Sequence, residues 1–230
     1  MNYTQISDMR KTGIPLIFAL GLLAATGSTS FAADGWYVSA TGGFSFAGDE
    51  SAATLTDGGG STTTDLEFDS GIAAGASVGR WITDQFRAEV DWVYRSNSND
   101  RVSTADSRSA SDGNLASSAL SINGYFHFGE TDVVGQFSPF VGAGIAYVNE
   151  VDIDLEGGDF GALYEDLEDD GVGFQMMLGA AYRQSDALRW TAELRWLSFG
   201  DADLQRSDGT RLADLGYDPL GAFLSVSYEF

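Results

Sequence analysis

The chain has 230 residues, with 34 Asp and Glu against 12 Lys and Arg, and a formal net charge of −22 at pH 7. Phosphate binding needs clustered cations, so this balance argues against nucleic acid as a partner. The sequence contains no cysteine, which excludes disulfides, thiol catalysis and zinc–thiolate sites. The length favours one domain, and 29 glycines against 3 prolines favour β structure with many turns.

The N-terminus has the features of a secretory signal peptide. Arg10 and Lys11 precede the apolar run IPLIFALGLLAATG, which is short for a membrane span. Ser30 and Ala32 place small residues at the two positions that specify cleavage. A membrane anchor is the weaker interpretation of this run. We therefore expect a signal peptide over residues 1–32 and a mature domain over residues 33–230.

The mature part contains segments in which apolar and polar side chains alternate. In QFRAEVDWVYR, Phe86, Val90 and Trp92 share one face, because successive side chains of a strand point to opposite faces. Eight segments follow this pattern, at residues 35–46, 68–79, 85–95, 116–128, 138–148, 172–182, 188–198 and 219–230. Each has about the length that a tilted strand needs to cross a bilayer.

The connections between these segments alternate in length. Long polar connections are expected near residues 48–65, 96–113, 149–170 and 199–218, and short ones near 80–85, 129–136 and 183–187. Short periplasmic turns and long external loops are typical of outer-membrane barrels. The pattern predicts an all-β fold, an eight-stranded antiparallel up-and-down transmembrane β-barrel, with both chain ends in the periplasm.

The second face of the strands would then line the lumen, and it carries charge. The predicted lumen charge network consists of Arg87, Glu89, Asp91, Arg95, Arg189, Glu193 and Arg195. An eight-stranded barrel is narrow enough for side chains to fill, and buried ions must be paired. We expect Arg87, Glu89 and Asp91 to meet Arg189, Glu193 and Arg195 across the interior and to close it to ions.

The C-terminal residues carry a resemblance to a known family. The chain ends in FLSVSYEF, with Leu224, Val226, Tyr228 and Phe230 at alternate positions. This ending resembles the signal by which outer-membrane barrels reach their assembly machinery. SPFVGAGIAYV and TDQFRAEVDWVYR resemble strands of the small outer-membrane β-barrel family, which includes the opacity-like porins and the barrels of OmpA and OmpX. The resemblance implies a cell outer membrane location, no cofactor, and the lipid, the lipopolysaccharide and the barrel assembly machinery as partners.

An enzyme is one alternative, because some small outer-membrane barrels modify lipid A or cleave peptides. The deacylase type needs a His-x-Ser pair near the outer leaflet. The single histidine, His127, is followed by Phe128 and Gly129 and falls at the periplasmic end of its segment. We therefore expect His127 to be structural.

The segment NEVDIDLEGGDFGALYEDLEDD contains ten acidic residues and no basic one. Asp152, Asp154 and Glu156, followed by Gly157, open like a calcium loop. The closing position is Leu163, so we hold these residues only as a weak metal candidate and favour a solvated acidic loop.

A soluble ligand-carrying barrel, such as a lipocalin, is also compatible with the alternation. The aromatic residues, however, sit at the ends of the segments on the apolar face, as in the interfacial girdles of a membrane barrel. We expect a non-enzymatic envelope component whose surface loops serve adhesion or binding. The alternative function is a small porin that passes solutes or ions.

Overall fold

The structure is a computed structural model that describes residues 35–48, 50–57, 60–104, 109–110, 112–129, 136–156, 164–205 and 209–230. The predicted signal peptide lies outside the described residues and stays a prediction. The described part consists of strands and their connections. They are β1 (Trp36–Phe46), β2 (Glu50–Asp57), β3 (Gly60–Phe68), β4 (Gly71–Trp81), β5 (Phe86–Thr104), β6 (Ser109–Ala110), β7 (Asp112–His127), β8 (Phe137–Glu156), β9 (Tyr164–Arg183), β10 (Leu188–Ser198), β11 (Asp201–Gln205), β12 (Arg211–Gly216) and β13 (Leu220–Glu229).

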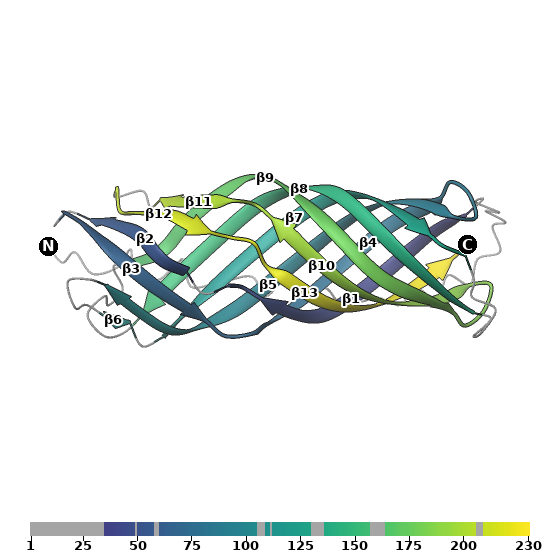
Figure 1. Ribbon diagram of the computed structural model, residues 1–230, viewed down its shortest axis with the longest axis horizontal. Helices are drawn as coiled ribbons and strands as arrows, with labels where there is room; N and C mark the ends of the chain where they lie inside the picture. Colours follow the sequence, from purple (N-terminus) through teal and green to yellow (C-terminus); the bar gives the residue numbers. More distant parts are fainter. Residues whose placement is uncertain are drawn as a thin grey trace, which may run out of the picture. The chain divides into compact units, whose positions relative to one another are not determined.

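The strands close into a barrel (Figure 1). Around one end the order is β1–β4–β5–β7–β8–β9–β10–β13, and β13 pairs with β1 to complete the ring. Every pairing is antiparallel between neighbours in this order, which confirms the predicted all-β, eight-stranded up-and-down barrel. No helix long and apolar enough to span a membrane occurs among the described residues.

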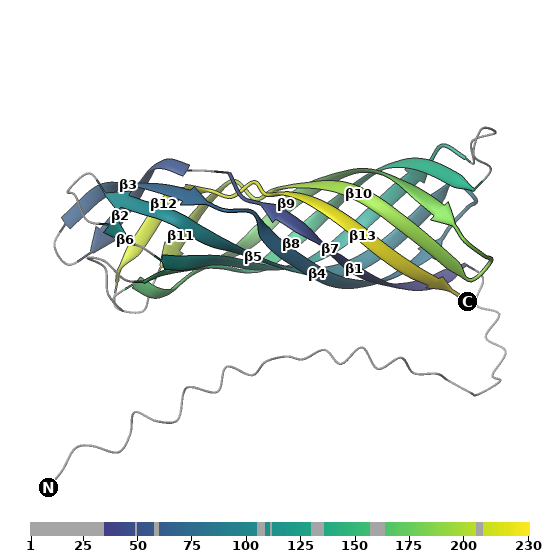
Figure 2. The ribbon, with the colours of Figure 1, turned by 90° about the horizontal axis from the view of Figure 1, so that it is seen from below.

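The predicted long polar loops are largely strands. β2 and β3 continue β1 and β4, while β11 and β12 continue β10 and β13 (Figure 2). With the long strands β5, β7, β8 and β9 they form a second closed ring, in the order β5–β3–β2–β12–β11–β9–β8–β7. We call this ring the outer half, and the ring that contains β1 and β13 the membrane half. Only loops were predicted here from the sequence, because these segments are polar and acidic.

The membrane half has its apolar side chains on the outside. Val90, Ile122 and Ile145 are each more than two-fifths exposed, and many other large apolar residues share this face. A water-soluble protein rarely exposes an apolar surface of this extent, but such a surface matches the hydrocarbon of a bilayer. The inward positions of the same strands carry mostly polar or small residues, together with two small apolar clusters around Phe223 and Phe140.

The outer half has the opposite arrangement. Its interior is an apolar core made of Leu55, Leu115, Ala119, Ala146, Val148, Val151, Ile153, Leu197, Ala202, Leu204, Leu212, Leu215 and Tyr217. The change takes place within single strands, and the β7–β8 register shifts there, between Ser118 and Ala119. Such a bulge bends the strand and re-aims its side chains.

Candidate functional site in the barrel interior

Strands β5 and β10 supply the charges of the membrane half. Arg87, Glu89, Asp91 and Arg95 alternate on the inward face of β5, and Glu193 and Arg195 on that of β10; each is no more than 7% exposed. These are three cations and three anions, so the buried charge is balanced. Burying ions is costly unless they are paired, and the geometry shows how most of them are.

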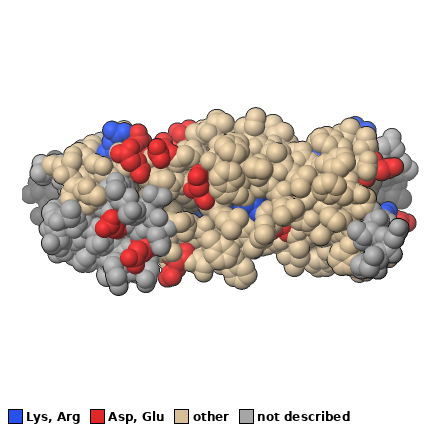
Figure 3. Space-filling model, in the orientation of Figure 1, with Lys and Arg blue, Asp and Glu red and all other residues tan. Residues whose placement is uncertain are grey.

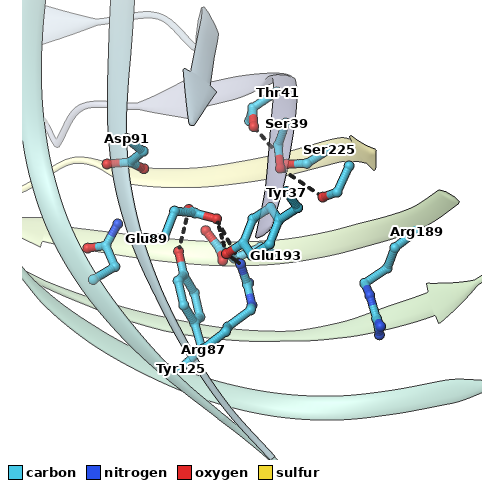
Figure 4. A network of polar contacts seen from close by, with 12 residues as sticks. Tyr37, Ser39, Thr41, Arg87, Glu89, Asp91, Tyr125, Arg189, Glu193 and Ser225 are labelled. Carbon is cyan, nitrogen blue, oxygen red and sulfur yellow. Dashed lines mark hydrogen bonds and ion pairs between the residues drawn. The ribbon is translucent and has the colours of Figure 1, made fainter. Parts of the chain in front are cut away.

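The first cluster is built around Arg87 and Glu89. The Arg87 Nη1 atom lies 2.8 Å from Glu89 Oε2 and also donates to the Tyr37 hydroxyl at 2.7 Å (Figure 4). Tyr37 donates its own hydroxyl proton to Glu89 Oε2 at 2.8 Å. The Arg87 guanidinium lies 3.7 Å from the ring centroid of Tyr125, whose hydroxyl reaches Glu89 Oε1 at 3.3 Å. Two tyrosines therefore hold this ion pair from opposite sides.

The second cluster joins β5 to β10 across the lumen. Arg195 Nη1 donates to Asp91 Oδ2, and Arg195 Nε donates to Glu193 Oε1 at 2.8 Å. Arg195 therefore binds two carboxylates with its fork of donors, which a point-charge ammonium cannot do as well. This contact lies on the path that an ion would take along the barrel axis.

Two of the predicted network members lie outside these clusters. Arg189 pairs with Glu229 at 2.6 Å and stacks on Trp81 at 4.7 Å, near the end where the short turns lie, and Figure 4 shows it pointing away from the cluster. Arg95 pairs with no carboxylate among the described residues and contacts the Phe223 ring at 5.9 Å. The expected meeting of Arg189 with the β5 charges is therefore not what the structure shows.

Small inward residues make room for the large ones. A Cβ atom added to Gly79 would overlap the Tyr37 ring, and one added to Gly142 would overlap Tyr125. Gly144 lies against Asn123, whose Oδ1 accepts from Gln175 Nε2 at 2.5 Å. A cavity of about 20 Å³ lies between the clusters, lined by Arg87, Glu89, Glu193 and Arg195, and holds roughly one water molecule. The lumen of the membrane half is filled by side chains.

His127 caps this network at the end with the short turns. Arg87 Nε donates to His127 Nε2 at 3.2 Å, and His127 Nδ1 lies 3.1 Å from the Ser138 hydroxyl. Because Nε2 accepts from a cation, the proton of the neutral ring belongs on Nδ1, which then donates to Ser138. A catalytic base would have to accept the serine proton instead. The sequence did not predict the contact between His127 and Ser138, although the alternation along β8 places Ser138 on the inward face.

Sequence reasoning also missed Tyr37 and Tyr125, which it did not single out. Both lie on the inward face of their strands, at 2% and 1% exposure. Trp36 and Phe126, the residues next to them, are exposed, so the period of two along a strand places both tyrosines on the inward face. This alternation is the signal that could have identified them.

The proposed assembly signal lies on the lipid-facing side of β13. Leu224, Tyr228 and Phe230 are about half exposed, and Val226 is partly buried. The Phe230 N–H donates to the Trp36 carbonyl at 3.0 Å, which brings the two ends of the barrel sequence together.

The weak metal candidate lies in the outer half. Asp152, Asp154 and Glu156 belong to the strand β8, and the side chains of Asp154 and Glu156 lie outside what the structure describes. The sharp turn that a calcium loop needs would fall at Gly157, which is also outside the described residues. The described part of the chain holds no group of three potential metal ligands.

The closed ring, the apolar exterior of the membrane half and the side-chain-filled lumen define a small transmembrane β-barrel protein of the outer membrane. The chain belongs to the family of outer membrane protein beta-barrel domains, whose family model matches residues 16–230.

Solved structures of similar fold agree with this assignment. OprG from Pseudomonas aeruginosa is 17% identical, with a TM-score of 0.62 over 86% of this chain and 96% of that one. Neisserial surface protein A is also 17% identical, with a TM-score of 0.53 over 86% of this chain and 98% of that one. At this identity the likeness concerns the fold alone. The comparison with curated proteins gave no match.

Proposed function

We propose that this protein is a non-enzymatic outer-membrane barrel that is closed along its axis and presents its outer half at the cell surface. The observation that carries the proposal is the Arg195 contact, which ties Asp91 and Glu193 together across the lumen. The Arg87–Glu89 cluster fills the adjoining layer. The apolar core of the outer half is a second barrier, because an ion would lose its hydration shell there without gaining partners.

The outer half is the part available for adhesion or binding. It extends the barrel by strands, so its surface is presented by a hydrogen-bonded scaffold. Its outward side chains include Asp201, Asp203 and Gln205 on β11, all exposed, while the intervening Ala202 and Leu204 are buried. Binding residues are commonly placed on rigid elements that project from a scaffold.

Single-channel recording on the refolded protein in a planar bilayer tests the closed barrel. We expect no steady conductance from the wild type. Arg195→Ala, which removes the tie across the lumen, is expected to produce brief openings if the protein still inserts. A wild-type barrel that conducts steadily at the level of an open channel would replace this proposal with the small-porin alternative.

The lipid A-modifying alternative receives no support from the geometry. His127 is 2% exposed, faces the lumen, and accepts a hydrogen bond from Arg87, so it is neither near the outer leaflet nor free to act as a base. Incubation of the folded protein with lipid A, followed by mass spectrometry, is expected to leave the lipid unchanged. Loss of an acyl chain that depends on His127 would overturn the non-enzymatic proposal.

Assembly of the barrel is proposed to depend on its last residue. Phe230 is 48% exposed on the lipid side and follows the alternation of β13. Deletion of Phe230 is expected to lower the amount of protein in the outer membrane, because the assembly machinery would lose the end of its signal. Unchanged membrane levels of the deletion variant would show that this residue is not read.

A further inference from the structure

The outside of the membrane half has a hollow where three neighbouring strands carry small residues. β13 lies between β1 and β10, and the outward positions Gly42, Ala192 and Ala222 of these strands line the floor of the hollow. Its volume is about 890 Å³, within the range of ~300–1,000 Å³ that is usual for ligand sites. Apart from its chain neighbours, nothing lies within 4 Å of a Cβ atom added to Gly42, so the space above the floor is open.

Large apolar side chains form the rim of this hollow. In the β1–β13–β10 ladder, Ala222 lies opposite Phe44 on one side and opposite Leu194 on the other. Leu224 is the next outward residue on β13. The exposed fractions of Phe44, Leu194 and Leu224 are 60%, 51% and 55%. A hydrocarbon chain that lies on Ala222 contacts the floor and these side walls together, whereas a flat apolar wall offers contacts on one side only. Dispersion attraction adds up over such contacts.

The surroundings of the hollow indicate a hydrocarbon occupant. In Figure 3 the surface between the acidic side chains of the outer half and the charged groups near the opposite end is largely uncharged. Glu193 lines the hollow at its base, but its carboxylate faces the lumen, where it accepts from Arg195. Lipid tails are as apolar as leucine, so no hydrophobic effect drives a second barrel onto this surface. A lipid chain, which already surrounds the membrane half, is therefore favoured over a second copy of the protein.

A tryptophan lies next to the hollow, on the side of the outer half. Trp196 follows Leu194 on the outward face of β10, close to the end of that strand. The other tryptophans Trp81, Trp92 and Trp190 each donate the indole N–H to a neighbouring side chain. The Trp196 N–H donates to none of the described residues. A tryptophan at a membrane interface keeps its ring in the apolar layer and offers its N–H to polar groups above.

We propose that the hollow holds one acyl chain of an outer-leaflet lipid and that Trp196 donates its N–H to the carbonyl group that links this chain to the rest of the lipid. The chain lies on Gly42, Ala192 and Ala222, and the rim residues hold it in place. The ligand is therefore a lipid with an ester-linked or amide-linked acyl chain. Only the choice of leaflet rests on the proposed orientation of the barrel, and the binding does not depend on a closed lumen.

Native mass spectrometry tests whether the hollow holds a lipid. Dimyristoyl phosphatidylethanolamine is titrated into the folded protein in a neutral detergent, and the lipid that stays bound after removal of the micelle is counted. We expect Ala222→Phe, which fills the hollow, to bind the lipid about tenfold more weakly than the wild type, or by ~1.4 kcal/mol. Ala143→Phe is the matched control and is expected to bind like the wild type.

Ala143 also faces outward, but it lies on β8, three strands from β13 around the ring. Both new side chains point into lipid, so the barrel interior is unchanged. Equal affinity in the wild type and Ala222→Phe, or equal losses in the two variants, overturns the proposal.

An ether-linked analogue of the same lipid, which lacks the carbonyl groups, tests the role of Trp196. We expect the wild type to bind the ester lipid about fivefold more tightly than the ether lipid, the usual contribution of one hydrogen bond at ~1 kcal/mol. Trp196→Phe is expected to bind the two lipids equally. Trp36→Phe, at the opposite end of the barrel wall, is expected to keep the preference. No preference in the wild type, or a preference that survives in Trp196→Phe, contradicts the assigned contact.

Cysteine cross-linking distinguishes a lipid from a second copy of the protein. The chain has no cysteine, so Gly42→Cys and Ala143→Cys each introduce a single thiol on the outward face. The two variants are placed in phosphatidylethanolamine-containing vesicles and oxidised, and the disulfide-linked dimer is measured on a denaturing gel. We expect Gly42→Cys to form dimer no faster than Ala143→Cys. Faster dimer formation by Gly42→Cys that persists when the protein is diluted with lipid would assign the hollow to a second copy and overturn the proposal.

Discussion

The two halves of the barrel share four strands and yet place their apolar residues on opposite sides. On β8, Val141, Ile145 and Tyr147 face outward and are exposed, whereas Val151 and Ile153, further along the same strand, face inward and are fully buried. The backbone is a closed antiparallel ring in both halves. What differs is the medium outside, hydrocarbon for one and water for the other, and the apolar face follows the medium.

The interiors differ accordingly. The interior of the membrane half holds paired carboxylates and guanidinium groups, hydroxyl groups and two small apolar clusters, around Phe223 and around Phe140. The outer half is filled like a soluble protein, by aliphatic packing. Substitutions that are equal in chemistry should therefore have different consequences in the two halves.

The largest difference is expected for arginines. Arg195→Ala leaves Asp91 and Glu193 buried without their cation, which should cost about 3–5 kcal/mol of unfolding free energy. Arg211→Ala in the outer half removes an ion pair with Asp203 whose side chains are 48% and 50% exposed, and should cost ~0–1 kcal/mol. Urea unfolding in lipid vesicles measures both. Arg87→Ala is expected to follow Arg195→Ala, and equal midpoints for the lumen and surface variants would contradict the buried network.

A smaller difference is expected for leucines. Leu212→Ala empties a site that is 0% exposed in the outer core and should cost about 2–5 kcal/mol, because transfer and cavity terms add. Leu194 is 51% exposed on the membrane half, where fluid acyl chains can occupy the space that Leu194→Ala leaves. The second variant should therefore lose only the transfer term. Urea unfolding compares them, and a larger cost for Leu194→Ala would show that the outer core is loosely packed.

The smallest difference is expected between the two faces of the membrane half. A Cβ atom at Gly144 would overlap Asn123 and the Ile122 carbonyl, so Gly144→Ala should cost about 1–3 kcal/mol. Nothing lies within 4 Å of a Cβ atom at Gly42. Gly42→Ala should be neutral or stabilise the strand by about 0.5 kcal/mol, since alanine has less freedom to lose than glycine. Similar costs for the two would mean that the lumen has room to relax.

The sequence alone determined the class of fold and the strands of the membrane half. Alternation has a period of two whatever surrounds the strand, so the lipid-facing set and the inward charges of β5 and β10 could be assigned from parity. The outer half could not be recognised in this way. Its strands are short and acidic, and Leu55, Leu204 and Leu212 become a core only when four hairpins bring them together.

Only the tertiary structure decided which lumen charges meet. Arg189 and Arg195 have the same parity on β10, so the sequence treats them alike. The stagger of strands around the ring sets the height of each residue, and it brings Arg195 level with Asp91 but leaves Arg189 beside Glu229. Closure of the ring also places Arg95 against the Phe223 ring, with no carboxylate partner among the described residues. Stagger and closure depend on pairings between all the strands, and no single segment encodes them.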